Sequence, residues 1–539
     1  MRKILLTICL ALLIPFQVWA GTINVSSYGD GTCSNSNVAL ALADAISGDT
    51  VECPACAECT WTGAVTVPAG VKLMGQGIGN TIVKYATETK IITLSDSSRV
   101  TGFTFQNGYL SPEGDGYRID NNRFEGLAAT TLNLYGILSY NDGRGLIDHN
   151  QFYNSKIVPL GGSVVNNAAW ATNLGLGTDD AVYIENNWLY SAFDSVLMDT
   201  NYGGAYVARY NTIQNQTVMA HAVQGNNRAT RKFEIYNNRW TISDASTAYT
   251  KKFGFLRAGT GVVYNNEAVG LVGWANGKWR TPYFYIDEQR SCATKDTSGE
   301  CNGSSLWDGN TAIGHDAFSL ATYGDDGNGT HDGAGNAAAL TDSTKTWTVD
   351  ALIGITVYNV TDGSSCEITD NDGTTVTCTL AGGTENDWDA GDTYKVTDGY
   401  PCRDQQGRSL DNPQWVSSPA GAYTQALDPL YAWNNFRYDT EEDRASKTSG
   451  SAITIEFEGT PCAISQAHVV DGRDYYNNGT TAKVGYTAYP FPHELDTEHA
   501  GWTLITADCT GHECLQRLGN TTLGSGSTFT FTGSTFTLQ

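Results

Sequence analysis

The middle of the chain concentrates side chains that can perform acid–base chemistry on an anionic substrate. Histidine side chains have a reference pKa near 6.5, which makes an imidazole a suitable general base at neutral pH, and His221 is the histidine of this stretch. Arg228 and Arg231 follow closely, and guanidinium groups neutralise a substrate carboxylate so that the proton next to it becomes acidic. We therefore predict that His221, Arg228 and Arg231 are catalytic residues.

The surrounding residues indicate how a substrate and a metal ion would be held. Arg209, Lys232 and Tyr202 are predicted to bind the substrate, through charge and through stacking on a sugar ring. Nearby aspartates offer the carboxylate oxygens that calcium prefers. The candidate calcium ligands are Asp180, Asp194 and Asp199. The alternative is that the arginines pair with these aspartates and only balance their charge.

A recurring sequence motif predicts the fold that must position these residues. In each copy a β-prone alternation of residues ends in Asn, and in most copies another apolar residue follows soon afterwards. The copies recur at intervals of roughly 24 to 37 residues, which is the period of a stacked repeat. The final asparagines are Asn122, Asn150, Asn187, Asn211, Asn238 and Asn266.

Each copy of the motif is predicted to form a strand followed by a bend. Asn tolerates the left-handed conformation that the bend needs, and stacked copies allow the amide side chains to hydrogen-bond to one another. The apolar residues that flank the asparagine, Ile119 with Phe124 and Ile235 with Trp240, should point inward. They would form a continuous core that only stacking can bury.

This pattern resembles the right-handed parallel β-helix of the pectate lyase-like superfamily, in which rows of asparagines are common. The resemblance implies an all-β fold. On such a coil, residues about one repeat apart lie on the same face. Asp199, Arg209, His221 and Arg228 could therefore converge.

The resemblance extends to a possible activity. The stretch from His221 through Arg228 and Arg231 to Tyr236-Asn-Asn238 is similar to the catalytic stretch of pectate lyases. It implies β-elimination on an acidic polysaccharide with bound Ca²⁺, and it gives Arg231 the role of base. The chain has Thr230 where the family has proline, and its aspartates match no calcium motif of that family. His221 is the chemically more suitable base.

Two other functions fit the same residues. A non-catalytic cell-surface or matrix protein would use the long coil face for glycan binding or assembly. A polygalacturonase-like hydrolase would use Asp179, Asp180, His221 and the basic stretch 228–232, whose order imitates that family. Hydrolysis needs two carboxylates at a suitable separation, and alanines flank His221 where that family has glycines.

Export is predicted by the first twenty residues. Arg2 and Lys3 precede an apolar run, and a small-residue cleavage site ends at Ala20. That run is too short to cross a membrane, and we expect no membrane span. With 32 Lys+Arg and 57 Asp+Glu the net charge is −25, which repels nucleic acid. The protein is predicted to be secreted or at the cell surface, with the periplasm as an alternative, and to have a polysaccharide partner.

The remaining sequence divides around an insertion. Residues 1–20 are the signal peptide, 21–332 the first part of the β-helix, and 398–500 its C-terminal part. Residues 333–397 are predicted to be a small inserted β module with a hairpin at Asp372-Gly373, and 501–539 to be edge strands or a sorting tail. Ser34 should cap a helix that covers the open end of the coil. Its buried face is predicted to carry Val38, Leu42 and Ile46.

The chain has 13 cysteines, of which Cys9 leaves with the signal peptide, and the even remainder predicts disulfides. Cys33, Cys53, Cys56 and Cys59 cluster near the start, where a Cys33–Cys59 bridge would hold the capping helix. The spacing of Cys53 and Cys56 could instead suggest zinc or a redox pair. The other expected pairs are Cys292–Cys301, Cys366–Cys378, Cys402–Cys462 and Cys509–Cys514.

A second polar cluster follows the insertion, in the stretches 402–408, 471–476 and 490–493. We interpret it as loops that Arg–Asp pairs hold against the coil, and a binding groove is the alternative. These stretches resemble the C-terminal part of bacterial secreted proteins described only as right-handed β-helix repeat proteins.

Overall fold

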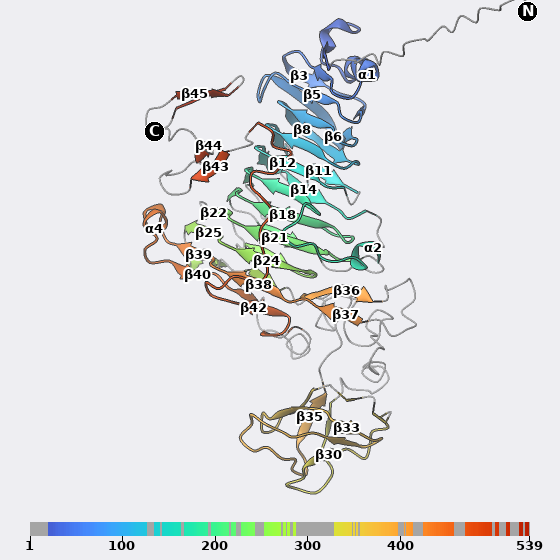
Figure 1. Ribbon diagram of the computed structural model, residues 1–539, viewed down its shortest axis with the longest axis vertical. Helices are drawn as coiled ribbons and strands as arrows, with labels where there is room; N and C mark the ends of the chain where they lie inside the picture. The colour runs from blue at the N-terminus through green and yellow to red at the C-terminus, as the bar shows by residue number, and fades with distance from the viewer. Residues whose placement is uncertain are drawn as a thin grey trace, which may run out of the picture.

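The fold is seen in a computed structural model. It describes residues 20–126, 134–140, 143–162, 167–191, 196–214, 217–221, 228–242, 253–270, 273–275, 278–280, 284–286, 328–347, 349–350, 352–353, 356–396, 404, 406–412, 424–457, 469, 471–498, 502–505, 514–517, 528–531 and 534–537. The chain is all-β with long parallel sheets, as Figure 1 shows, and its few helices are short.

Three ladders of parallel strands make up most of the chain. Successive segments add one strand to each, which we call ladders A, B and C. Ladder A consists of β1 (Thr22–Asn24), β2 (Thr50–Glu52), β5 (Lys72–Met74), β7 (Arg99–Thr101), β9 (Tyr117–Asp120), β12 (Gly145–Asp148), β15 (Val182–Glu185), β18 (Ala205–Arg209), β21 (Lys232–Tyr236), β24 (Thr260–Tyr264), β38 (Leu430–Trp433) and β42 (Tyr475–Asn477).

Ladders B and C share two long strands, β6 (Thr81–Leu94) and β8 (Thr104–Pro112). Ladder B continues through β3 (Cys56–Thr60), β10 (Arg123–Glu125), β13 (Gln151–Tyr153), β16 (Trp188–Tyr190), β19 (Thr212–Gln214), β22 (Arg239–Ile242), β25 (Glu267–Gly270) and β39 (Phe436–Tyr438). Ladder C consists of β4 (Val65–Val67), β11 (Tyr135–Ser139), β14 (Lys156–Pro159), β17 (Val196–Met198), β20 (Thr217–Ala220), β23 (Gly254–Leu256), β28 (Phe284–Ile286) and β41 (Ile455–Phe457).

A row of buried asparagines marks the bends between ladders A and B, as predicted. The side-chain amide of Asn122 donates to Oδ1 of Asn150 at 3.2 Å, and the same bond repeats along the row. The row also includes Asn435, whose Oδ1 accepts from Asn266 at 2.9 Å across the insertion. The left-handed residue is the one before each ladder asparagine. These residues, with φ of 52–57°, are Asn121, His149, Asn186, Tyr210, Asn237, Asn265 and Asn434.

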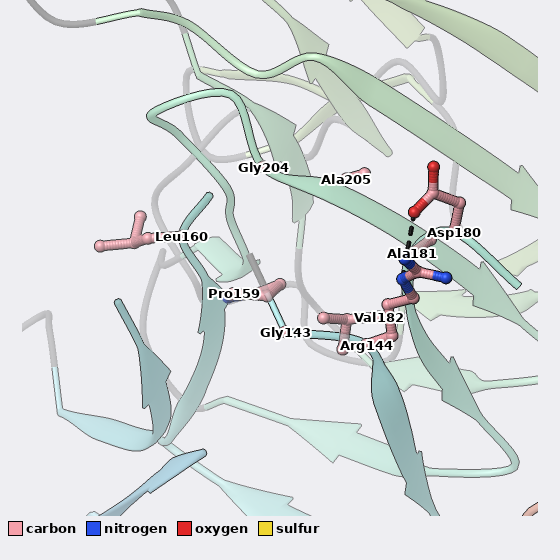
Figure 2. Close-up of a pocket in the computed structure, with 9 residues that line it drawn as sticks. All are labelled: Gly143, Arg144, Pro159, Leu160, Asp180, Ala181, Val182, Gly204 and Ala205. Carbon is pink, nitrogen blue, oxygen red and sulfur yellow. Dashed lines mark ion pairs between the residues drawn. The ribbon is translucent and has the colours of Figure 1, made fainter. Parts of the chain in front are cut away.

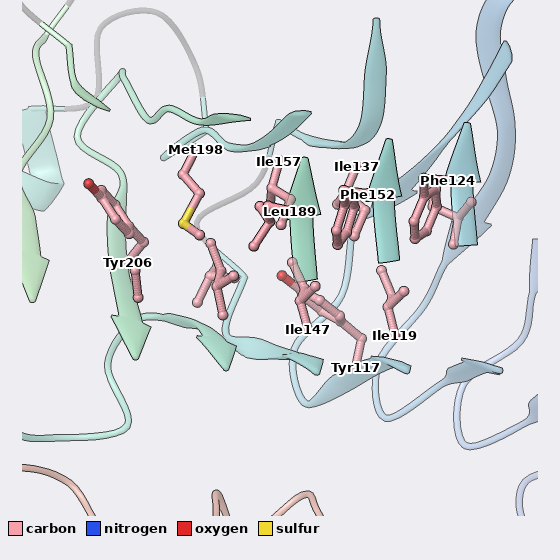
Figure 3. Packing of buried hydrophobic residues seen from close by; sticks show 14 of the residues in the cluster. Tyr117, Ile119, Phe124, Ile137, Ile147, Phe152, Ile157, Leu189, Met198 and Tyr206 are labelled. Carbon is pink, nitrogen blue, oxygen red and sulfur yellow. The ribbon is translucent and has the colours of Figure 1, made fainter. Parts of the chain in front are cut away.

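The core lies between the ladders, and the predicted inward residues are confirmed. Ile119, Phe124, Ile235 and Trp240 are all fully buried. Equivalent positions stack from one copy to the next, as Figure 3 shows for Phe124 and Phe152, whose ring centroids lie 4.7 Å apart. This repetition buries a continuous apolar column along the ladders.

Helix α1 (Asn35–Asp44) packs at the N-terminal end of the ladders. Ser34 caps it as predicted, because its side chain accepts from the backbone N–H of Asn37 at 3.3 Å. Val38 and Leu42 are buried, but Ile46 is 44% exposed. The prediction for Ile46 was wrong because the helix ends before that residue.

The inserted strands pair with one another and enclose a separate apolar core. Two antiparallel sheets contain β29 (Asn328–Thr330), β31 (Thr356–Asn359), β32 (Ser365–Glu367) and β35 (Thr393–Val396), and β30 (Ala339–Thr341), β33 (Asp370–Asn371) and β34 (Thr375–Thr377). The hairpin at Asp372-Gly373 is confirmed by the pairing of β33 with β34. These pairings begin at β29, five residues before the predicted start of the module.

The remaining elements are short. Helices are η1 (Val25–Ser27), α2 (Asn167–Trp170) and α4 (Glu441–Ser446); paired strands are β26 (Gly273–Ala275) with β27 (Lys278–Arg280), β36 (Arg408–Asn412) with β37 (Thr424–Leu427), β40 (Ser451–Ala452) with β39, β43 (Trp502–Ile505) with β44 (Cys514–Arg517), and β45 (Thr528–Phe531) with β46 (Ser534–Thr537). Within the described residues, no helix is long and apolar enough to span a membrane.

The cysteine predictions are confirmed in part. Cys366 and Cys378 form the expected disulfide in the inserted module. The Cys33–Cys59 prediction was wrong, because Cys59 pairs with Cys56, whereas Cys33 and Cys53 are buried thiols. The pairs Cys292–Cys301, Cys402–Cys462 and Cys509–Cys514 each include at least one residue outside the described part of the chain.

Candidate functional site

Arg228 is a buried structural residue and not an exposed catalytic one. Its guanidinium has no exposed surface and donates to the carboxylate of Asp404, with Nη2 at 2.6 Å from Oδ1. The backbone N–H of Ala229 donates to the same carboxylate at 2.9 Å, and the Trp170 ring lies 4.9 Å from the guanidinium carbon. This pair holds the segment around Asp404 against the loop before β21, so the predicted contact of Arg228 with substrate was wrong.

The two neighbouring cations are buried as well. Nε and Nη2 of Arg231 donate to the carbonyls of Ala169 and Thr172 at 3.0 and 2.7 Å. Nζ of Lys232 donates to the carbonyl of Gly175 at 2.7 Å, and burial lowers the pKa of this ammonium group. Both side chains therefore fix the loop before β15, and the roles predicted for Arg231 as a catalyst and for Lys232 as a substrate ligand are corrected.

Arg209 lies on the outward face of ladder A beneath a later segment of the chain. We call residues 483–498 the strap. Arg209 donates to the carbonyls of Tyr489 and Pro490 in the strap at 2.7 and 2.9 Å, and it also pairs with Glu185. It is fully buried, so it holds the strap and does not face a substrate. The prediction that Arg209 and Arg228 share a face with Asp199 and His221 was wrong.

Three other predicted residues have separate positions. Tyr202 is half-buried with φ of 58°, and its backbone N–H donates to the carbonyl of Arg228 at 2.9 Å. Asp180 lines a shallow surface pocket shown in Figure 2 and pairs with Arg144 at 3.2 Å. Both partners are more than half exposed, so the pair contributes little to stability. Asp194 lies outside the described residues.

Asp199 and His221 are the predicted residues that the structure brings together. Asp199 directly follows β17, and its backbone N–H donates to the carbonyl of Ile157 in β14. His221 directly follows β20 and is linked in the same way to Thr200. Their neighbours Met198 and Ala220 fill the core. Because side chains alternate along a strand, Asp199 and His221 point outward from ladder C.

Lys156, Arg257 and Tyr135 also lie near Asp199. The two cations among them, Lys156 and Arg257, were not predicted from the sequence. The charges of His221, Lys156 and Arg257 all stabilise the ionised carboxylate of Asp199, so they lie within electrostatic range of it. Arg257 follows β23 as His221 follows β20, and its backbone N–H donates to the carbonyl of Ala220 at 2.9 Å. Nζ of Lys156 lies 4.4 Å from the ring centroid of Tyr135. We call this set, Tyr135, Lys156, Asp199, His221 and Arg257, the ladder C site.

The electrostatics of the ladder C site favour proton transfer. Burial raises the pKa of the Asp199 carboxyl even though three neighbouring charges act to lower it. Its Oδ1 is buried and makes no hydrogen bond to any described residue. Burial also lowers the pKa of Lys156 and raises that of Tyr135. Carboxyl groups perturbed in this way are typical of functional sites.

Aromatic side chains extend this face along the ladder. The ring of Tyr109 in β8 lies 5.9 Å from that of Tyr135, and Tyr140 is 53% exposed. Arg257 lies 5.3 Å from the ring of Phe255. Rings of this kind, beside charged groups, suit the stacking of sugar rings.

Two of the three predicted calcium ligands, Asp180 and Asp199, have other surroundings in the structure, whereas Asp194 lies outside the described residues, so the calcium prediction stays untested. Asp199 is surrounded by positive side chains, and Asp180 pairs with Arg144. Among the described residues, neither belongs to a group of three or more side chains that can hold a metal. One such group, Asp148 with His149 and Asp496, is already bridged by the Arg118 guanidinium, which lies 2.7 Å from both carboxylates. Among the described residues, neither Cys53 nor Cys56, the zinc alternative, belongs to a group of side chains that could hold a metal ion.

The second polar cluster holds loops against ladder A, as interpreted from the sequence. Asp474 is fully buried and pairs with Arg408 at 3.0 Å and with Arg473 at 2.7 Å. Asp404 belongs to the same cluster through its pair with Arg228. These Arg–Asp pairs are structural.

Comparison of the chain with models of known protein families gives no match, and comparison with curated proteins gives none either.

Proposed function

We propose that the protein is an exported right-handed parallel β-helix protein of the pectate lyase-like type. The pairing of successive segments into three parallel ladders, with a row of asparagines at one bend, supports this architecture. Parallel crossover connections are right-handed in almost all proteins, which supports the handedness. The apolar N-terminal run and the disulfides Cys56–Cys59 and Cys366–Cys378 support export.

We further propose that the protein acts on an acidic polysaccharide by β-elimination at the ladder C site. The observation that carries this proposal is that Lys156, His221 and Arg257 all lie within electrostatic range of the outward-facing Asp199. A carboxylated sugar needs cations beside its carboxylate, and Lys156 and Arg257 supply them. This assignment moves the chemistry from Arg228 and Arg231 to residues of ladder C.

In the proposed reaction, His221 accepts the proton from C5 of the uronate. The electron pair of that C–H bond forms a double bond between C4 and C5, and the bond from C4 to the glycosidic oxygen breaks. Asp199 gives its proton to the departing oxygen, because burial keeps this carboxyl protonated to a higher pH than an ordinary aspartic acid. Lys156 and Arg257 neutralise the carboxylate while charge develops on it.

The raised pKa of Asp199 also favours a second candidate, a glycoside hydrolase. Hydrolysis needs one protonated and one ionised carboxyl. Lys156 interacts electrostatically with both Asp199 and Glu88, so a second carboxylate lies on the same face. Glu88 accepts a hydrogen bond from the backbone N–H of Tyr135 at 2.8 Å, which holds it beside the ladder C site. In this candidate Asp199 is the acid and Glu88 the base.

The test is an assay of pectate, alginate and glycosaminoglycans for two products. Unsaturated uronates indicate elimination, and new reducing ends without unsaturation indicate hydrolysis. We expect unsaturated products, with rates lowered about 100-fold or more in His221→Ala and Asp199→Asn because each removes a proton-transfer group. Arg257→Ala should also be slow, whereas its control Arg239→Ala, on ladder B, should match the wild type. Binding without either product would favour a non-catalytic glycan-binding protein.

A further inference from the structure

The strap covers the charged outward face of ladder A. Six successive strands, β7 to β21, present Arg99, Arg118, Asp148, Glu185, Arg209 and Glu234 on this face, and all but Arg99 are almost completely buried. The strap runs along the face in the direction opposite to strand order, from β24 back to β7, and Figure 1 shows it in front of β18 and β21. Its cover is therefore the reason these charges are out of contact with water.

Direct contacts connect the strap to nearly every strand that it crosses. The hydroxyl of Tyr486 donates to Glu234 at 2.6 Å, and the backbone N–H of His493 donates to Glu185 at 3.0 Å. Towards the C-terminal end of the strap, Asp496 pairs with Arg118 at 2.7 Å and Glu498 with Arg99 at 2.7 Å. The strap thus binds the face largely through charged and polar groups, whose state of ionisation decides whether they attract.

His493 is the buried titratable group at the centre of the strap. Its side chain packs against the rings of Tyr183 and Tyr489, with ring centroids 4.6 and 5.3 Å away. Nδ1 accepts the backbone N–H of Leu495 at 3.1 Å, so in the closed strap this nitrogen carries no proton. A protonated imidazole would lose that hydrogen bond and would place a charge beside Arg209 in a buried position.

We propose that the strap is an acid-sensitive latch, which is closed at neutral pH and is opened in mildly acidic solution by the protonation of His493. Opening exposes the charged side chains of ladder A. The exposed first residues of the strap and the turn just before it provide the freedom to open. Val484 in the strap is 95% exposed, and Gly485 in the strap and Gly479 before it adopt positive φ with open space around them. This latch lies on a different ladder from the ladder C site and does not depend on the proposed enzymatic activity.

The direction of the pH effect follows from the burial of the imidazole. Burial, and then the charge of Arg209, lower the pKa of His493 to about 4 from an ordinary value of 6.5. Below 6.5 the open form binds a proton that the closed form cannot, so opening becomes easier as pH falls and the effect is complete near 4. Over this range the ratio of open to closed strap should rise by about two orders of magnitude.

Other titratable groups face His493 and act on the latch in both directions. Glu185 acts in the opposite direction, because burial raises its pKa and its protonation therefore favours the closed form in acid. Asp148 and Asp179 attract a protonated His493, whereas Arg118 and Arg209 repel it. The charged and titratable groups around the ring are Arg118, Asp148, Asp179, Tyr183, Glu185, Arg209 and Tyr489.

Hydrogen–deuterium exchange of the full chain at pH 7.5, 5.5 and 4.5, corrected for intrinsic exchange rates, tests the latch. We expect peptides from 483–498 to lose protection as pH falls, while peptides from β15 and β18 keep theirs. In His493→Gln, whose side chain cannot be protonated, the strap should stay protected at pH 4.5. The matched control His331→Gln, at a buried histidine of the inserted module, should behave like the wild type.

Two results would overturn the proposal. The first is a wild-type strap that is as protected at pH 4.5 as at 7.5, which needs no variant to be folded. The second is opening at the same pH in the wild type and in a folded His493→Gln. A second variant, His493→Phe, preserves ring packing against Tyr183 and Tyr489, and it should also stay closed in acid.

Discussion

The carboxylate of Asp404 accepts hydrogen bonds from Nε and Nη2 of Arg228, which precedes it by 176 residues. Both side chains are fully buried, so this pair connects the chain after the insertion to the loop before β21. Two residues that look like parts of separate binding sites in the sequence are thus one structural contact.

Removal of one partner from this pair should strongly destabilise the protein. Asp404→Asn keeps the size of the side chain and tolerates the φ of 60° at this position, but leaves the Arg228 charge buried without its counter-charge. We expect the free energy of unfolding to fall by about 3–5 kcal/mol, measured by denaturant titration. Asp180→Asn, at the exposed pair with Arg144, should cost less than about 1 kcal/mol. Equal losses in the two variants would contradict the structural role of Asp404.

The row of asparagines should be sensitive to any single break. In Asn187→Ala the amide that donates to Asn211 is lost, and so is the Oδ1 that accepts from Asn150. Because the backbone and side-chain groups left behind are buried, we expect a loss of about 2–4 kcal/mol in thermal or chemical unfolding. Asn80→Ala, at an exposed asparagine, is the control. It should lower the free energy of unfolding by less than about 1 kcal/mol.

Asp199 should reduce stability at neutral pH, since its pKa is raised by burial. A raised pKa means that the folded state prefers the protonated carboxyl, so this residue favours folding in acid and disfavours it as pH rises. Asp199→Asn should therefore unfold at higher denaturant concentration than the wild type at pH 7, and the difference should shrink near pH 3. A variant that is less stable at pH 7 would show that the carboxylate holds the fold together.

The Cys366–Cys378 disulfide should stabilise the inserted module alone. The bridge joins residues 12 apart, and the loss of a bridge of that loop size costs about 3 kcal/mol. In Cys366→Ser/Cys378→Ser, exchange should increase in strands β30 to β35 and stay unchanged in ladders A to C, because the module has its own core. Exchange that rises equally in the ladders would show that the two parts unfold together.

The sequence predicted the framework better than the site because the framework is local. Each strand and bend is determined by a few consecutive residues. The asparagines and the inward positions Ile119 and Phe124 could therefore be identified by their spacing. The site depends on contacts between distant segments. Arg209 is buried by strap residues about 280 positions later, and no local pattern reveals that cover.

Lys156 and Arg257 were missed for a related reason. Lys156 begins β14, whereas Arg257 directly follows β23, and the loops that separate the ladder C strands differ in length, so no fixed spacing relates the two cations to His221. The hydrogen bond from Arg257 N–H to the carbonyl of Ala220 reveals that Arg257 lies beside His221, but only in three dimensions. The basic cluster 228–232 drew attention in the sequence because its charges are adjacent, although folding buries them.

The proposed function is tested most directly by a hydrogen–deuterium exchange footprint of the full chain with and without an oligouronate. We predict that the ligand protects the peptides that contain Lys156, Asp199, His221 and Arg257, and that peptides of ladders A and B are unchanged. The footprint should disappear in Lys156→Ala/Arg257→Ala. Protection centred on ladder A or ladder B, or binding that survives in the double variant, would contradict the proposed function.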